Sequence, residues 1–404
     1  MKLQFTLFED HCLENFHPLT LTRPVYDLRV GIYTLEEKWK RALNLTKEMT
    51  GLTRANLKGV FPENEIVQNP EFFLWVNPRF LPKRSLINQI NNLNKNVAIQ
   101  HKDSLIAAKI KPHTHNEWKI NGIDLTNLET IAPSANDVIE IRNLWDLFLQ
   151  NGSEISSDLQ RIHRKFRQQN YDGVHFINPD QVHIEEGAVI EPGVVLIAEK
   201  GPIYIGKNAH IMANSVVRGP SAICEQSVLK VGSKIYEDTT IGPVCKIGGE
   251  VANSIFHSYS NKAHDGFVGN SLFGQWVNLG ADTNTSNLKN NYSTVKISNW
   301  NDESETDSHQ QFLGTIMGDH SKTAINTMLN TGTVCGVSCN LFSEGFPPKL
   351  IPSFSWVANN QIETYRFDKS IEAMKKMMER RSIELTPAYK KMMETLFESG
   401  LTPY

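Results

Sequence analysis

Aliphatic residues recur at every sixth position in the middle of the chain. A helix would need a period of 3.6 and a simple strand a period of two, so neither explains the pattern. A triangular coil of three short parallel strands, about 18 residues per turn, does explain it. The sequence therefore predicts a left-handed parallel β-helix of hexapeptide repeats. We expect these residues on its axis: Ile184, Ile190, Leu196, Ile205, Ile211, Val217, Ile223, Leu229, Ile235, Ile241 and Ile247.

The period of six lapses after Ile247 and later returns. We therefore expect the β-helix to cover residues 173–345. Residues 283–311 lie between the two periodic stretches. They are mostly polar and have no aliphatic residues at six-residue spacing. A long loop on a rigid coil is a common location for chemistry, and a merely solvated loop would have the same composition. The period resumes at Met317, Thr323, Leu329, Cys335 and Leu341.

The pattern in residues 1–172 predicts an α/β domain. Apolar and polar residues alternate over 3–7, which favours a strand, and the run 72–76 is apolar enough for a buried one. Thr34 and Glu37 have the spacing of a capping box at the start of a helix. Strands that alternate with helices in this way usually form one α/β sheet.

The chain beyond the β-helix, residues 346–404, predicts a short helical tail. Thr386 and Pro387 read as the N-cap and first position of its second helix. A basic amphipathic segment over 155–169 predicts a helix that links the α/β domain to the β-helix. The methionines of the tail suit packing better than a cofactor site. They are Met374, Met377, Met378, Met392 and Met393.

Charge and cysteine content narrow the classes of partner. Lys and Arg number 41 against 44 Asp and Glu, so there is no basic surplus for a nucleic acid or an anionic membrane. The aliphatic runs are far shorter than the roughly 20 residues that cross a bilayer. The five cysteines lack CxxC spacing, which favours a reducing compartment. We expect a cytoplasmic protein that binds small molecules and neither nucleic acid nor membrane.

Residues 248–290 carry the candidate chemistry. Within them, Lys262, Ala263 and His264 precede the run "VNLGADTNTSN". This order resembles the acetyltransferase centre of the bifunctional GlmU-type enzymes, which make UDP-N-acetylglucosamine. The resemblance extends over roughly residues 180–345, and the plan of the whole chain is similar to a Bacteroidetes-type variant of that family.

The resemblance implies a general base and a set of binding residues. His264 matches the base, and histidine suits this role because acetyl transfer needs a group that takes the proton of an attacking amine near pH 7. The binding positions that the resemblance implies are Glu250, Asn278, Asn287 and Lys234 for an amino-sugar phosphate, and Ala281 and Thr315 for acetyl-CoA.

Three positions depart from the family pattern. Phe267 stands where the family has a tyrosine, and Ala252 and Ser293 stand where it has lysines. The acceptor phosphate would therefore meet two fewer cations. Lys262 or Lys289 could replace them.

Residues 18–31, "PLTLTRPVYDLRVG", resemble the stretch that follows the phosphate loop in sugar nucleotidyltransferases. The resemblance makes Arg23 and Arg29 candidates for nucleotide phosphate, with UTP or dTTP as the nucleotide and Mg²⁺ as the metal of such a domain. The glycine-rich loop itself is missing, and Asn77 stands where a strand-end Gly-Asp is expected. No site residue is predicted as a metal ligand.

Three functions remain open from the sequence. The first is an enzyme of sugar-nucleotide biosynthesis, an acetyl-CoA-dependent N-acetyltransferase acting on a glucosamine-1-phosphate-like acceptor, with a divergent sugar-1-phosphate uridylyl- or thymidylyltransferase domain. The second is a sugar-nucleotide sensor or trimeric scaffold without acyl transfer. The third is metal hydration chemistry of the γ-class carbonic anhydrase type, for which His210, His257 and His264 would have to meet. Because solenoids of this kind usually close into symmetric assemblies, we expect a homotrimer.

Overall fold

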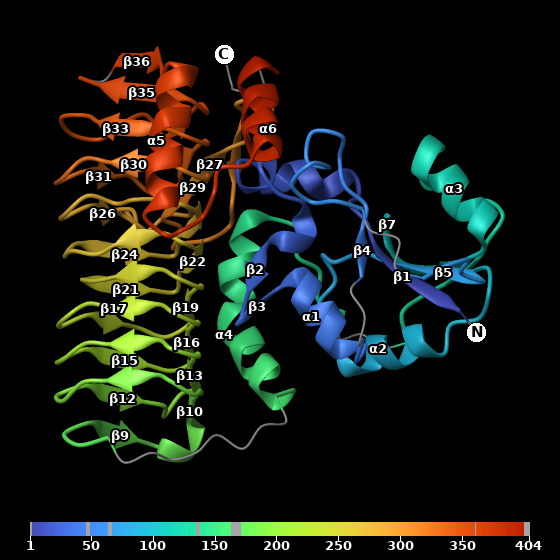
Figure 1. The fold of residues 1–404 in the computed structure, drawn as a ribbon, viewed down its shortest axis with the longest axis horizontal. Helices are drawn as coiled ribbons and strands as arrows, with labels where there is room; N and C mark the ends of the chain where they lie inside the picture. Colours follow the sequence, from blue (N-terminus) through green and yellow to red (C-terminus); the bar gives the residue numbers. More distant parts are fainter. Residues whose placement is uncertain are drawn as a thin grey trace. The chain divides into compact units, whose positions relative to one another are not determined.

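The computed structural model describes residues 2–45, 49–63, 67–134, 138–162, 171–359 and 361–399 (Figure 1). Its contacts divide the chain into two compact units. The first consists of Met1–Leu13, Arg23–Leu28 and Tyr33–Arg142, and the second of Glu14–Thr22, Arg29–Ile32 and Asn143–Tyr404.

The first unit is built on a mixed sheet of six strands in the order β4-β1-β5-β7-β6-β8. Strand β1 runs parallel to β5, and β5 runs antiparallel to β7. The predicted α/β fold is confirmed. The strands are β1 (Leu3–Leu7), β4 (Thr50–Gly51), β5 (Phe72–Val76), β6 (Val97–His101), β7 (Ser104–Ile110) and β8 (Glu129–Ile131).

The predicted capping box is present at the first helix of this unit. The Thr34 hydroxyl accepts from the Glu37 backbone N–H, and the Thr34 N–H donates to the Glu37 carboxylate. The helices are α1 (Leu35–Ala42), α2 (Arg84–Asn91) and α3 (Pro112–Asn121), and the short strand β3 (Tyr33–Thr34) precedes α1, whereas strand β2 (Arg29–Val30) belongs to the second unit.

A parallel β-solenoid from residue 175 to residue 358 dominates the second unit (Figure 1). Its strands form three faces, which the chain visits in the order I, II, III. Face I contains β10 (Val182–Ile184), β13 (Ile203–Ile205), β16 (Ser221–Ile223), β19 (Thr239–Ile241), β22 (Ile255–Ser258), β25 (Leu272–Gln275), β29 (Thr315–Met317), β32 (Thr333–Cys335) and β34 (Leu350–Ile351).

Faces II and III complete each coil. Face II contains β11 (Val189–Ile190), β14 (His210–Ile211), β17 (Val228–Leu229), β20 (Lys246–Ile247) and β23 (Asn261–Lys262), then β30 (Lys322–Thr323), β33 (Asn340–Phe342) and β35 (Ser355–Ala358). Face III contains β9 (His175–Ile177), β12 (Val195–Ile197), β15 (Val216–Arg218), β18 (Lys234–Ile235), β21 (Glu250–Ala252) and β24 (Phe267–Gly269), followed by β26 (Asn284–Thr285) and β31 (Met328–Leu329).

The eleven aliphatic residues at six-residue spacing fill the axis of the solenoid as predicted. Ten of the eleven, from Ile190 to Ile247, belong to one buried cluster, and Ile184 in the first coil is partly buried against it. The solenoid does not end at residue 345. Cys335 pairs with Ile351 and Leu341 with Val357, so two axial columns continue to β34 and β35.

The strict count of six lapses because individual coils shorten. Ile247 pairs with Lys262, which is 15 residues further along the chain, and Phe256 pairs with Phe273 after 17 residues. The coil is continuous through this region, and only its corners have lost residues.

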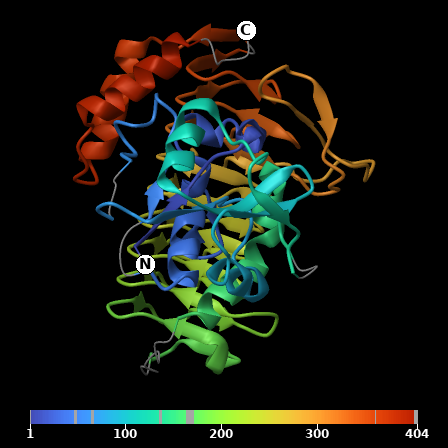
Figure 2. The same cartoon turned by 90° about the vertical axis from the view of Figure 1, so that its right-hand side faces the viewer.

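The loop predicted over 283–311 is an ordered excursion. It contains an antiparallel hairpin of β27 (Lys296–Ser298) and β28 (Glu305–Asp307), and Val295, Ile297 and Trp300 are buried within it. Figure 2 shows this hairpin and the two tail helices on different sides of the solenoid.

The helix expected over 155–169 begins earlier, as α4 (Leu144–Gln160). The Asn151 amide donates to the Asp238 carbonyl at 2.8 Å, and the contacts group α4 with the solenoid. The contacts place Asn143–Tyr404 in the second unit, and the boundary at 172/173 stays a prediction. Residues 163–170 lie outside the described residues.

The tail forms the two predicted helices, α5 (Phe367–Glu379) and α6 (Pro387–Glu398), after strand β36 (Gln361–Thr364). The Thr386 hydroxyl caps α6 by accepting from the Tyr389 N–H at 3.2 Å. Four of the five methionines are buried as packing residues: Met374, Met378, Met392 and Met393. In the described chain, no helix is long and apolar enough to cross a membrane.

Candidate active site

His264 lies at the corner where the chain turns from face II to face III, between β23 and β24. Its side chain is exposed and makes no hydrogen bond or ion pair with any residue that the structure describes. A general base must keep a ring nitrogen available for the proton of its substrate. We call a side chain uncommitted when it has no hydrogen bond or ion pair among the described residues. An uncommitted imidazole on a rigid corner meets that requirement.

Lys262 lies inside the solenoid beneath this corner, and the sequence did not predict this buried position. It is the Cα partner of Ile247, so it takes an inward position, and only 1% of its surface is exposed. Its ammonium group donates to the carbonyl oxygens of His264 at 2.8 Å and Asp265 at 3.0 Å. Burial lowers the pKa of Lys262 to about 8. Lys262 therefore does not replace a missing phosphate-binding lysine.

Lys234 and Glu250 adjoin the same corner on face III. They are Cα partners in β18 and β21, and the Glu250 N–H donates to the Gly266 carbonyl at 3.1 Å. Lys234 is exposed and Glu250 half-buried, and neither side chain has a hydrogen bond or ion pair among the described residues. The structure thus brings an ammonium and a carboxylate, both uncommitted, next to the corner of His264.

Ala281 lies in the next corner of the same column. The Asp282 N–H donates to the Asp265 carbonyl at 3.1 Å, and the Ala281 carbonyl accepts from the Asn326 N–H at 2.8 Å. Its backbone therefore lies one coil from His264, and its contact with acyl-CoA stays a prediction.

The two candidate asparagines lie apart from one another. Asn278 is on face II, bridged to Asn261 and Lys322. Asn287 lies at the far end of face III, where its amide donates to the Asn270 side chain at 2.8 Å. One chain alone does not gather both asparagines around His264.

Thr315 does not lie where its expected role requires. It is the first residue of β29 on face I, it is fully buried, and its N–H donates to the Ser271 hydroxyl at 2.9 Å. A thioester cannot reach this hydroxyl through the packed coil, so the burial of Thr315 gives its expected role no support.

The predicted phosphate ligands Arg23 and Arg29 are also buried. Arg23 is 1% exposed and pairs with Asp27 at 2.9 Å. Arg29 is 7% exposed, and its Nε donates to the His257 carbonyl at 3.1 Å. Both guanidinium groups support the fold and are not accessible to a triphosphate, which corrects the prediction.

The three histidines of the metal hydration hypothesis do not meet. His210 on face II pairs with Glu191 at 2.7 Å, whereas His257 is buried on face I and His264 is at the corner of faces II and III. Zinc needs its ligands within bonding distance of one point. The described residues therefore give this hypothesis no support.

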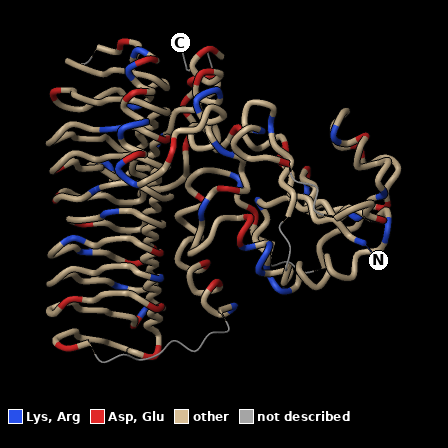
Figure 3. The backbone as a smooth tube through the Cα atoms, viewed as in Figure 1, with Lys and Arg blue, Asp and Glu red and all other residues tan. Residues whose placement is uncertain are grey.

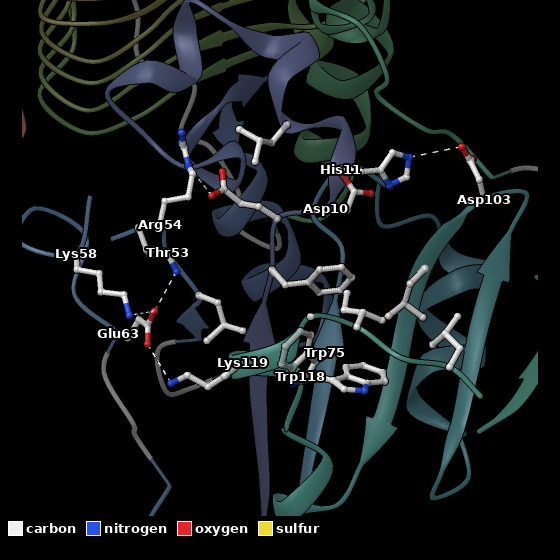
Figure 4. A pocket seen from close by; sticks show the side chains of 18 residues that line it. Asp10, His11, Thr53, Arg54, Lys58, Glu63, Trp75, Asp103, Trp118 and Lys119 are labelled. Carbon is white, nitrogen blue, oxygen red and sulfur yellow. Dashed lines mark hydrogen bonds and ion pairs between the residues drawn. The ribbon is translucent and has the colours of Figure 1, made fainter. Parts of the chain in front are cut away.

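The first unit has a cavity of about 590 Å³ at the carboxyl end of β1 (Figure 4). A cavity of this size suits a small molecule. Trp75 and Trp118 form part of its wall, with their ring centroids 5.1 Å apart in an edge-to-face arrangement. The signal that could have revealed it is the run "FED" directly after the first strand, because α/β sheets bind ligands at strand ends. Its charged residues are Glu9, Asp10, His11, Arg54, Lys58, Glu63, Asp103 and Lys119.

The charged groups of this cavity neutralise one another. Arg54 pairs with Glu9 at 2.9 Å, and Glu63 pairs with both Lys119 at 3.0 Å and Lys58 at 3.3 Å (Figure 4). Burial raises the pKa of Glu9 despite its partner Arg54. A ligand would have to displace these partners or bind through the aromatic wall.

The residues of this cavity do not fit a magnesium ion. Among the described residues, only Asp10, His11 and Cys12 place three potential ligand atoms together, and Cys12 does not line the cavity. Asp10 already accepts from Arg79 at 2.9 Å and Asn77 at 2.7 Å. Burial alone would raise the pKa of Asp10, but the hydrogen bonds and charge of Arg79 lower it. Magnesium prefers several oxygen ligands, and an imidazole and a thiol do not supply them.

The fold and these sites define the class of the protein. It combines an α/β unit that has a cavity at its strand ends with a parallel β-solenoid that has an uncommitted histidine at one corner. Residues 5–166 match the family model described as "Sugar nucleotidyl transferase". This match includes the sheet of the first unit and α4.

Several curated proteins named "Bifunctional protein GlmU" are distant relatives of the chain. The protein of Synechococcus elongatus is 28% identical over 241 residues, which cover 54% of this chain and 48% of the relative. That of a Picosynechococcus species is 28% identical over 272 residues, covering 59% and 53%. The chain thus spans about half the length of the curated relatives it matches.

Solved structures show weaker likenesses. A UDP-N-acetylglucosamine acyltransferase from Campylobacter jejuni is 13% identical, with 58% of this chain and 96% of that chain covered, at a TM-score of 0.24. A GDP-perosamine N-acetyl transferase from Caulobacter crescentus, solved in complex with CoA and GDP-perosamine, is 12% identical, with 45% and 55% covered, at 0.13. These scores are too low to support an inference about function.

Proposed function

We propose that the solenoid is an acetyl-CoA-dependent N-acetyltransferase for an amino-sugar phosphate such as glucosamine 1-phosphate. The observation that carries the proposal is the uncommitted His264 at an exposed corner, with Lys234 and Glu250 beside it. The relatives named GlmU add support from the sequence.

The reaction follows from these groups. The neutral amine of the sugar attacks the thioester carbonyl carbon of acetyl-CoA, and a ring nitrogen of His264 takes the proton that the amine loses. As the new amide bond forms, the carbon–sulfur bond breaks and CoA leaves as a thiolate, which then takes up a proton. Lys234 would hold the phosphate through its charge, and Glu250 would accept a hydrogen bond from the sugar.

The proposal includes a homotrimer in which neighbouring chains complete the acceptor site. Two observations support it. Asn278 and Asn287 lie on separate faces of one chain, and two large apolar side chains in the corner column of His264 are exposed, Val231 by 61% and Ile325 by 69%. A second copy of the solenoid would cover them. Sedimentation that shows a fully active monomer would refute this part.

The first unit is proposed to bind a sugar nucleotide or nucleoside triphosphate at its cavity. Its match to sugar nucleotidyl transferases supports the nucleotide, and the paired charges support slow transfer or none. The second candidate function is therefore a sugar-nucleotide sensor in this unit, favoured by the committed Asp10 and the missing magnesium ligands.

Two assays run side by side test the proposal. The first follows release of CoA thiol from acetyl-CoA with a panel of amino-sugar phosphates, and the second follows pyrophosphate release from UTP and dTTP with sugar 1-phosphates. We expect turnover in the first and little in the second. If no amino sugar is acetylated, the acyltransfer proposal fails. Rapid pyrophosphate release would refute the sensor function.

A further inference from the structure

We propose that Lys262 is a positioning residue that fixes the corner carrying His264, acting from inside the solenoid. The inference rests on the proposed role of His264 and adds to it the group that holds the base in place. Lys262 does not touch either substrate, because it is 1% exposed.

The register shows that lysine is exceptional at this position. The axial column of face II contains Ile211, Leu229 and Ile247 in the coils before Lys262. An aliphatic side chain would pack there without moving a charge out of water. The fold therefore tolerates an ammonium where its own pattern supplies apolar residues, and stability does not explain the choice.

The contacts of the ammonium group indicate what lysine adds. Its two hydrogen bonds go to consecutive carbonyls, those of His264 and Asp265, at 2.8 and 3.0 Å. These carbonyls belong to the turn itself, so both bonds restrain the backbone from which the imidazole projects. The corner is otherwise exposed, since His264 and Asp265 are both exposed side chains.

The neighbouring corner leaves room for this ammonium. Gly249 has a φ of +71°, and a Cβ at that position would lie 2.8 Å from the Lys262 Nζ. Glycine thus serves two needs at once, a left-handed corner and space for the buried charge. Burial lowers the pKa of Lys262, which fits an ammonium held by carbonyls and not by a directly bonded carboxylate.

The test uses the full-length chain with Lys262→Met, and Lys322→Met as the matched control. Lys322 is a half-buried lysine whose pKa burial lowers to about 8, and its ammonium donates at 3.1 Å to the carbonyl of His320, at the corner between faces I and II. We expect Lys262→Met to lower kcat for acetyl transfer by about 10- to 100-fold, the usual effect of a misplaced group, with KM for both substrates unchanged. We expect Lys322→Met to keep kcat.

Amide hydrogen exchange of residues 263–266 gives a readout that does not depend on activity. We expect faster exchange there in Lys262→Met, with an unchanged circular dichroism spectrum and no loss of thermal stability. Unchanged exchange, or wild-type kcat, would overturn the proposal. If Lys262→Met and Lys262→Leu both fail to fold, Lys262 is a folding residue and the positioning role is also refuted.

The two proposals can fail separately. If the wild-type protein acetylates no amino sugar, the proposed function fails, and the exchange measurement still decides whether Lys262 orders the corner. If the wild type is active and Lys262→Met is equally active, only the inference about Lys262 fails.

Discussion

The corner of His264 and the cavity of the first unit use charged side chains in opposite ways. At the corner, the imidazole, the Lys234 ammonium and the Glu250 carboxylate are left without partners among the described residues. In the cavity, Glu9 is paired with Arg54, and Asp10 is held by Arg79 and Asn77.

The difference separates groups that are available for chemistry from groups that stabilise a fold. A carboxylate that already accepts from a guanidinium must lose that partner before it can bind a ligand, and the exchange costs free energy. An exposed, uncommitted group has no such barrier. Figure 3 shows charges of both signs scattered along the chain, so it is the partners and not the charges themselves that distinguish the two sites.

The largest expected effect is the loss of acetyl-transfer rate when His264 at the corner is replaced. His264→Ala should lower the rate of acetyl transfer by about 10² to 10⁴, the usual contribution of a general base, and a higher pH should restore part of the rate because more of the acceptor amine is then neutral. Initial rates of CoA release measure this. His210→Ala is the control, because His210 is tied to Glu191. Wild-type turnover of His264→Ala at neutral pH would leave the scaffold or sensor function as the better account.

In the cavity, the largest effect should be on stability. Arg79→Met removes the only guanidinium partner that the described residues give Asp10, whereas Glu140 keeps Arg142 at 3.8 Å, and Arg79 is 1% exposed. Breaking a buried pair from one side costs about 3–5 kcal/mol of unfolding free energy. Urea unfolding measures the loss, and adding Asp10→Asn to the same chain should recover part of it. An unchanged midpoint would show that the pairing of Arg79 does not stabilise the fold.

Because Lys262 is buried, we expect the free energy of unfolding to depend on pH. This dependence would further distinguish the corner of His264 from the cavity. Burial lowers the pKa of Lys262 from 10.5 to about 8, so the unfolded chain binds more protons than the folded one between these values. The free energy of unfolding should therefore rise with pH across that window, by up to about 1.4 kcal/mol per pH unit. Lys262→Met should lack this contribution. Thermal unfolding of both chains at pH 7, 8, 9 and 10 compares the slopes, and equal slopes would contradict the shift.

The smallest expected effects concern the asparagines. Asn278→Ala and Asn287→Ala should each raise KM for the acceptor by about 2- to 10-fold, the equivalent of one hydrogen bond, and leave kcat near its wild-type value. Steady-state kinetics with varied acceptor measure this. The control is Asn270→Ala. It removes the side chain that accepts the hydrogen bond of Asn287, and it leaves the amide of Asn287 in place. A change in kcat alone would place these residues closer to the chemistry than we propose.

Most of the fold could be predicted from the sequence because its signal is local and periodic. The axial positions of the solenoid, the capping box at Thr34 and the N-cap at Thr386 all depend on residues a few positions apart. The shortened coils after Ile247 were not predictable from the strict count, since a corner can lose residues while the strands stay in register.

Less of the candidate site could be predicted. The motif around His264 is contiguous and could be found in the sequence, and the structure places His264 at an exposed corner. The burial of Arg23, Arg29 and Thr315 was not predictable, because it depends on segments far away in the chain. The inward position of Lys262 is not predictable from its immediate sequence, because it depends on the length of its coil, which is 15 residues from Ile247 to Lys262 and 18 from Leu229 to Ile247. The cavity combines residues from five separate stretches, which periodicity does not reveal.

The hairpin that leaves the solenoid after β26 has an evolutionary consequence. Its two ends meet, because Leu288 bridges Phe312 and the Leu313 N–H donates to the Asn287 carbonyl at 2.9 Å, and β25 pairs with β29 as if nothing had been inserted. An excursion closed at its base can lengthen, shorten or be exchanged without shifting any coil. The solenoid can therefore retain one core while natural variation remodels the segment between Asn287 and Leu313, so that a new recognition surface could arise without a new fold.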